Sequence, residues 1–198
     1  INVPIYATKL TIGIIDNKLR EHNMLTKVKR KVVKYGQHIN LGCFRVEFIK
    51  TNHSIQDAAA LAIYSPAGIV VHTGDFKVDY TPVFGDAIDL QRFAEIGKKG
   101  VLALMSDSTN AERPGFTQSE RTVGATFDHI FAEHQNTRII IATFASNVDR
   151  VQQIINSACK YERKVVVEGR SMVNIISVAQ ELGYLHVPDH TLVEIDQL

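Results

Sequence analysis

The first part of the chain alternates apolar and polar side chains in the way that is typical of strands. In residues 44–50, apolar Phe44, Val46 and Phe48 are separated by charged side chains, which predicts a strand with one buried face. Shorter apolar runs predict further strands at residues 3–7, 31–35, 58–64 and 69–72. The Ser-Pro-Ala-Gly sequence at 65–68 predicts a hairpin turn between the last two. This part is therefore predicted to form a mostly antiparallel sheet.

Five stretches carry apolar residues at the spacing of an amphipathic helix. They begin after Thr8, near residue 88, after a cap at Thr117 or Ser119, near Asn147, and at Ser171. The second helix is predicted to end at Gly97 or Gly100 and the last at Gly183, because glycine readily adopts the conformation that closes a helix.

From residue 100 onward, strands and helices are predicted to alternate. Continuous apolar runs at 101–105, 138–144 and 164–167 are typical of strands buried on both faces. Such alternation favours a parallel, doubly wound sheet. The loop at 110–116 is the best candidate for a domain boundary. The sequence thus predicts an α/β protein in which a strand-rich first part changes, from near residue 88, to a pattern of alternating strands and helices.

Composition narrows the class of protein. The chain has 198 residues, 45% of them hydrophobic and 22% charged, which suits one or two globular domains. No apolar run is long enough to cross a bilayer. Cys43 and Cys159 lie far apart, which excludes a disulfide framework and a cysteine-rich zinc motif, and a reducing cytoplasm is expected. The chain begins Ile-Asn-Val-Pro, so we expect it to have been cut from a longer protein.

The net charge of the whole chain is +1, but one stretch of it is strongly basic. Between Lys18 and Lys34 there are seven Lys or Arg residues and one acid, Glu21. This stretch could attract phosphates, or it could be the solvated end of a hairpin or helix.

Polar side chains with metal-binding chemistry follow two of the predicted strands. His53 comes shortly after the strand at 44–50, and Asp75 follows the apolar run at 69–72. Imidazole and carboxylate groups at adjacent strand ends are what a hydrolytic metal site needs. The alternatives are a loop histidine and an aspartate that caps a turn. His72 is predicted to point away from Asp75 and is not taken as a ligand.

Later strand ends are polar as well. Asp107 follows the run at 101–105, where it could orient a metal-bound histidine or a water, or simply cap the strand end. Ser146 and Asn147 open a helix whose free N–H groups suit a phosphate, although a plain N-cap explains them equally. Arg170 follows the run at 164–167 in a similar way. Walker, nucleophile-elbow, dinucleotide and His-Glu-x-x-His motifs are absent from the sequence.

Taken together, these segments resemble a known family. The resemblance is carried by residues 52–55, 71–77, 106–117, 142–147, 150–153 and 169–172, of which 106–117 is the most specific. They are similar to bacterial ribonuclease J, from the β-CASP branch of the metallo-β-lactamase superfamily, and the similarity spans essentially the whole chain.

The resemblance implies two partial domains. Residues 1–110 would be part of a metallo-β-lactamase αββα sandwich, and residues 111–198 part of a doubly wound β-CASP domain. The family's His-x-His-x-Asp-His motif would precede residue 1, and its later β-CASP histidines would follow residue 198. Two positions depart from the family pattern, with Gln56 in place of a common proline and Asp149 in place of a common histidine.

The resemblance also implies roles for the candidate residues. His53 would be a metal ligand, and Asp75 would bridge two zinc ions. Asp107 would match the first acidic motif of the β-CASP region, so that Asp75 and Asp107 are the predicted catalytic residues. Ser146 and Asn147 would face RNA. With Arg170, which is proposed from its strand end alone, they form the predicted RNA- or phosphate-binding set.

The parent protein is therefore predicted to be a zinc-dependent ribonuclease with 5′-to-3′ exonuclease and endonuclease activity. It would act on RNA in the cytoplasm, in rRNA processing and mRNA decay, as a homo-oligomer or with a paralogous subunit, and without membrane attachment. The chain alone is predicted to be inactive, because two ligands are fewer than the four that zinc takes. The alternatives are a non-catalytic RNA-binding or scaffold subunit, and a phosphate- or nucleotide-binding domain that uses the strand ends at 107, 146 and 170.

Overall fold

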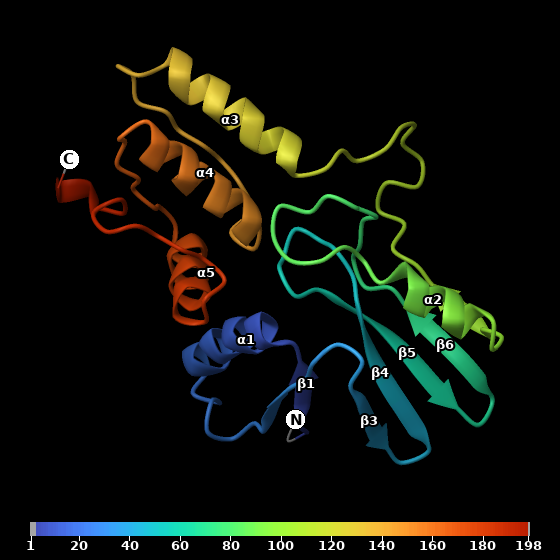
Figure 1. The fold of residues 1–198 in the computed structure, drawn as a ribbon. Helices are drawn as coiled ribbons and strands as arrows, with labels where there is room; N and C mark the ends of the chain where they lie inside the picture. The colour runs from blue at the N-terminus through green and yellow to red at the C-terminus, as the bar shows by residue number, and fades with distance from the viewer. Residues whose placement is uncertain (1–2, 198) are drawn as a thin grey trace.

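A five-stranded sheet forms the centre of the first half of the chain, in a computed structural model that describes residues 3–197. Its strands, in spatial order, are β3 (His38–Leu41), β4 (Phe44–Lys50), β5 (Ala59–Ser65), β6 (Gly68–His72) and β7 (Ala103–Met105). The first four pair antiparallel (Figure 1). Strand β7 joins β6 in parallel. As a result β4, β6 and β7 run in the same direction, and their carboxyl ends share one edge of the sheet.

Helix α2 (Leu90–Gly97) covers one face of this sheet. Its Ile96 is fully buried against Ile49, Ala60 and Val71. A charged contact fixes the helix as well, because Arg92 donates to both carboxylate oxygens of the buried Glu47 at 2.6 and 2.9 Å. Glu47 was expected on the polar face of its strand, and α2 supplies the partner that allows this face to be buried.

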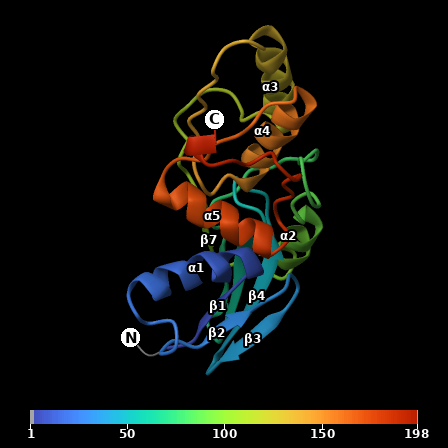
Figure 2. The same ribbon diagram turned by 90° about the vertical axis from the view of Figure 1, so that its left-hand side faces the viewer.

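A smaller unit lies beside the sheet. Strands β1 (Ile5–Ala7) and β2 (Arg30–Val32) pair in parallel, and α1 (Lys9–Glu21) connects them. Helix α1 packs against α5 (Arg170–Glu181), although the two are far apart in the sequence (Figure 2).

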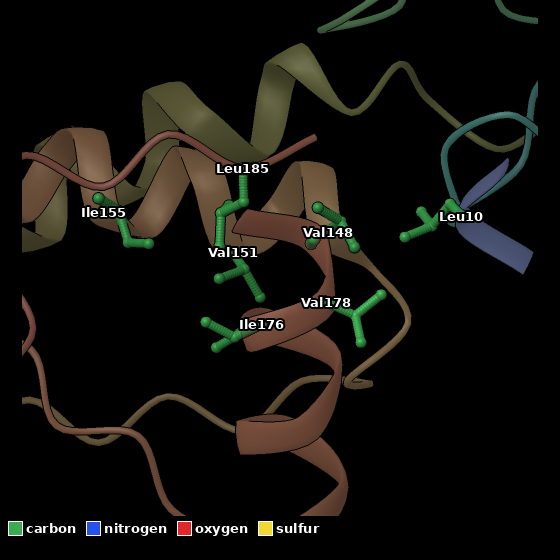
Figure 3. Close-up of a cluster of buried hydrophobic side chains, with 8 residues drawn as sticks. Leu10, Val148, Val151, Ile155, Ile176, Val178 and Leu185 are labelled. Atoms are coloured by element: carbon green, nitrogen blue, oxygen red, sulfur yellow. The ribbon is translucent and has the colours of Figure 1, made fainter. Parts of the chain in front are cut away.

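The second half of the described chain is mainly helical. Helices α3 (Arg121–Glu133) and α4 (Val148–Lys160) pack together, and a short 3₁₀ helix, η1 (Ile195–Gln197), follows α5. Buried side chains of α4 and α5 meet Leu185 and, from α1, Leu10, as Figure 3 shows. This apolar cluster joins the first and last parts of the chain.

Much of the predicted pattern is confirmed. The chain is α/β, the strand at 44–50 and the hairpin form, and helices occupy all five predicted stretches. Strand β3 was not predicted. The segment 106–120 contains no helix or strand; the domain boundary expected near residue 110 falls within it and stays a prediction. None of the helices between residues 3 and 197 is long and apolar enough to cross a bilayer.

Three predicted strands differ from the structure. Residues 138–144 form no strand, and Ile140 and Phe144 are 88% and 80% exposed. In 164–167, only Val165 forms an isolated bridge, to Leu192. The run at 101–105 does form β7, which is the last strand of the sheet, but it is not buried on both faces, since Leu104 is 64% exposed. An apolar run becomes a buried strand only where neighbouring strands accept its hydrogen bonds, and the described residues provide none for 138–144.

Candidate functional site

Three predicted site residues lie at one edge of the sheet. His53, Asp75 and Asp107 follow β4, β6 and β7, the three strands that run in the same direction. The Nε2 atom of His53 lies 3.6 Å from Oδ2 of Asp75. These two groups therefore lie close together, as a shared metal site would require, while their roles as metal ligands stay a prediction.

Thr73 joins the loops that carry the two aspartates. This buried residue donates its backbone N–H to the carbonyl of Met105 at 3.0 Å. Its hydroxyl accepts the N–H of Asp107 at 3.0 Å and donates to the carbonyl of Gly74 at 2.7 Å. One side chain, which the sequence did not single out, thus fixes the backbone at both aspartates.

Asp107 itself forms a local turn. Its Oδ1 accepts the hydroxyl of Thr109 at 2.6 Å and the backbone N–H of the same residue at 2.9 Å. The Thr109 hydroxyl, followed by its N–H, holds the pKa of Asp107 below its usual value, and nearby His53 adds to the effect. The strand-end cap that the sequence kept as an alternative is present. An ionised carboxylate that lies near His53 can also act as a hydrogen-bond acceptor for a histidine or a water.

A cavity of about 570 Å³ opens at this edge of the sheet. His53, Asp75 and Asp107 line it from the sheet, and Asn147 lines it from the start of α4. This volume falls within the range of small-molecule sites and exceeds what a single metal ion needs.

The residues predicted to contact RNA are not gathered together. Asn147 lines the cavity, but its side chain caps α4 by accepting the N–H of Arg150 at 3.1 Å. Ser146 and Arg170 are not among the residues that line this cavity. Arg170 is an exposed residue in the first turn of α5. An RNA-binding role for these three side chains stays a prediction.

Comparisons with known proteins agree on one family. A family model described as "Ribonuclease J, beta-CASP domain" matches residues 136–198. Ribonuclease J of Synechocystis sp. is 47% identical over 190 residues, which are 96% of this chain and 30% of that protein. Ribonuclease J of Helicobacter pylori (strain J99) is 45% identical over 98% of the chain, and ribonuclease J2 of Bacillus subtilis is 37% identical over all of it.

Nearly the whole chain is similar to the ribonuclease J family. The chain spans about a third of the length of these relatives, between 28% and 36%. A solved structure from Enterococcus faecalis V583, described as a protein of unknown function, matches with a TM-score of 0.67 at 20% identity. That match covers 98% of this chain and 50% of the other, and it shows a shared fold.

The side chains at the sheet edge fit part of a metal site. Histidine nitrogen and aspartate oxygen are both donors that zinc accepts, but zinc takes about four of them. Within residues 3–197, no three His, Cys, Asp or Glu side chains are grouped so that they could hold a metal ion. His53 and Asp75 thus offer suitable donors in too small a number.

A second polar contact at the cavity links the two halves of the described chain. Gln56, in the loop between β4 and β5, donates its amide N–H to Oδ1 of Asp149 in α4. Next to Asp149, Arg150 binds Glu120 through two hydrogen bonds of 2.7 and 3.1 Å. Gln56 and Asp149 are the two positions named above as departures from the pattern that the resemblance implies, and nothing else in the sequence pointed to their contact.

Proposed function

We propose that this chain is part of a metal-dependent ribonuclease that hydrolyses RNA phosphodiester bonds. The observation that carries the proposal is the 3.6 Å approach of His53 to Asp75, at a sheet edge that also holds Asp107. The names of the relatives support the RNA substrate, since each is called a ribonuclease. The whole protein would act in the cytoplasm as an exonuclease and endonuclease, in rRNA processing and mRNA decay, and as a homo- or hetero-oligomer.

His53 and Asp75 would hold zinc together with donors from other parts of the longer protein. Bound zinc supplies a water whose pKa is near neutral and stabilises negative charge on phosphate oxygens. Thr73 would keep Asp75 and Asp107 at a fixed separation through its two hydroxyl hydrogen bonds. Asp107, which is ionised at neutral pH, would accept a hydrogen bond from His53 or from a water and so orient it.

The test is RNA cleavage by the full-length protein that contains this chain, with His53→Ala, Asp75→Asn and Asp107→Asn made singly. We expect His53→Ala and Asp75→Asn to lower kcat/KM by about 100-fold or more, because they remove metal ligands. Asp107→Asn, which changes a group that orients others, should lower it by about 10- to 100-fold. His129→Ala is the matched control, since His129 is exposed on α3 and pairs only locally with Glu133.

Cleavage by all three variants at the rate of the parent would refute the proposal. RNA binding without cleavage, in the parent as well as in the variants, would favour the non-catalytic RNA-binding or scaffold subunit instead.

A further inference from the structure

Residues 79–88 form a strap between β6 and α2 that has no helix or strand. Pro82, Val83, Phe84 and Gly85, at the tip of this strap, line the same cavity as His53 and Asp75. The metal-site residues described above do not explain what this strap does.

One end of the strap is held by Ser119 and Arg121, which lie just before and at the start of α3. The buried Asp79 accepts the N–H of Thr81 at 2.9 Å. Ser119 donates its hydroxyl to the carbonyl of Thr81 at 2.9 Å. Arg121, in α3, donates to the carbonyl of Pro82 at 3.3 Å.

The other end is fixed by the residue that precedes His53. Asn52 accepts the N–H of Ile88 at 2.6 Å and donates to the carbonyl of Asp86 at 3.0 Å. The tip of the strap therefore has a defined position relative to His53. A fixed platform loses little conformational entropy when a ligand binds.

The tip presents an aromatic ring, and the glycine that follows this ring in the sequence lies close to a cation. Phe84 remains 41% exposed although it is a large apolar side chain that lines a cavity. Gly85, at φ +71°, lies close to Lys50. A β-carbon added to Gly85 would be 3.6 Å from Nζ of Lys50. The Lys50 ammonium lies over the ring of Tyr35, 5.0 Å from its centroid, whereas Lys77, also in the cavity wall, pairs with Asp79 at 3.4 Å.

A partly exposed aromatic ring and an ammonium group that line the same cavity suit a single-stranded nucleic acid. Bases stack on aromatic side chains whatever their sequence, and a nearby lysine contacts the phosphate. We propose that the strap tip and Lys50 form a nucleotide subsite, in which Phe84 stacks on a base and Lys50 contacts an adjoining phosphate. The subsite rests on the proposed function, since the phosphodiester to be cleaved would lie at His53, Asp75 and Asp107.

The experiment uses the full-length protein and a phosphorothioate-linked single-stranded oligoribonucleotide, whose slow hydrolysis allows binding to be measured by fluorescence anisotropy. Phe84→Ala is expected to weaken binding by about 5- to 150-fold, the range found for the loss of one stacked base. In cleavage of ordinary RNA it is expected to raise KM and leave kcat nearly unchanged. Phe84→Trp should retain binding, because it keeps the stacking surface.

Two further variants make the experiment specific. Phe116→Ala removes a phenylalanine that is 89% exposed and does not line the cavity, and it should bind like the parent. Lys50→Gln should reduce the slope of log binding constant against log salt concentration by about one, as expected for the loss of one phosphate contact.

Binding by Phe84→Ala equal to that of the parent would overturn the subsite, and so would a loss of the same size in Phe116→Ala. The proposed function is judged separately, by cleavage in the His53→Ala variant. A parent that binds RNA through Phe84 without cleaving it would support the subsite and refute the nuclease.

Discussion

Asp149 is a carboxyl group in a setting that disfavours its charge. Burial raises its pKa to about 6, although the amide of Gln56 donates to it; Glu120 raises the pKa further, and Lys77 and Lys50 oppose the rise. Its position in the first turn of α4 would by itself favour the carboxylate, so burial outweighs the helix dipole.

We predict that Asp149 makes stability depend on pH between about 4 and 6. The folded state has the higher pKa and binds more protons in this range, so the free energy of unfolding falls as the pH rises. Asp149→Asn, which keeps the acceptor for Gln56, should remove this slope. It should stabilise the chain at pH 7 by about 2 kcal/mol, less than the full shift implies, because the group is partly exposed.

Urea unfolding of the parent and of Asp149→Asn at pH 5 and pH 7 checks this. The difference between the two proteins in how the free energy of unfolding changes with pH isolates Asp149, since every other titratable group is the same in both. If the free energy of unfolding changed with pH by the same amount in both proteins, the pKa shift of Asp149 would be contradicted.

At the scale of elements, Asp57 connects three segments that are distant in the sequence. Thr8 precedes α1 but forms no side-chain cap of its own. Instead its hydroxyl donates to Asp57 at 3.0 Å, and the other oxygen of Asp57 accepts the N–H of Leu10 at 2.9 Å and the hydroxyl of Tyr184 at 2.8 Å. A loop of the sheet thus caps α1 and anchors the chain that follows α5.

We predict that Asp57→Ala lowers the free energy of unfolding by about 2–3 kcal/mol. The change removes a helix cap and leaves the Tyr184 hydroxyl without its acceptor. Asp57 also has a φ of 54°, which alanine tolerates less well than asparagine does, so Asp57→Asn should cost less.

Urea denaturation followed by circular dichroism measures these changes, with the exposed Asp189→Ala as the control. If Asp57→Ala were as stable as the control variant, the connection would be structurally unimportant.

At the scale of the whole molecule, the number of metal donors decides what the isolated chain can do. His53 and Asp75 approach each other, but no third donor joins them in the part of the chain that the structure describes. Complete structural zinc sites reach about 10–16 kcal/mol of binding free energy because several ligands act together.

We therefore predict that the isolated 198 residues bind zinc far more weakly than a complete site and do not cleave RNA. Calorimetry with zinc and a cleavage assay with and without added metal are the measurements. His53→Ala distinguishes weak binding at the sheet edge from binding elsewhere, since only the former would change. Tight binding by the isolated chain, or cleavage that depends on metal, would contradict the prediction.

The periodicity of the sequence determined the elements whose partners lie nearby along the chain. The strand at 44–50, the hairpin around residues 65–68 and the five helices form as predicted, because apolar spacing and turns act over a few residues. The cap predicted at Thr117 or Ser119 is wrong, since α3 begins after Glu120 and has no side-chain cap. The polar strand ends were visible too, and the shared direction of β4, β6 and β7 brings His53, Asp75 and Asp107 to one edge.

Tertiary structure alone decided the features that depend on distant partners. Burial of Glu47 needed Arg92, the cap of α1 needed Asp57, and the raised pKa of Asp149 needed burial against the loop of Gln56. The apolar run at 138–144 stayed outside any sheet, since a strand requires a neighbour for its backbone hydrogen bonds. A sequence specifies which groups seek partners, but only the folded chain determines which partners come within reach.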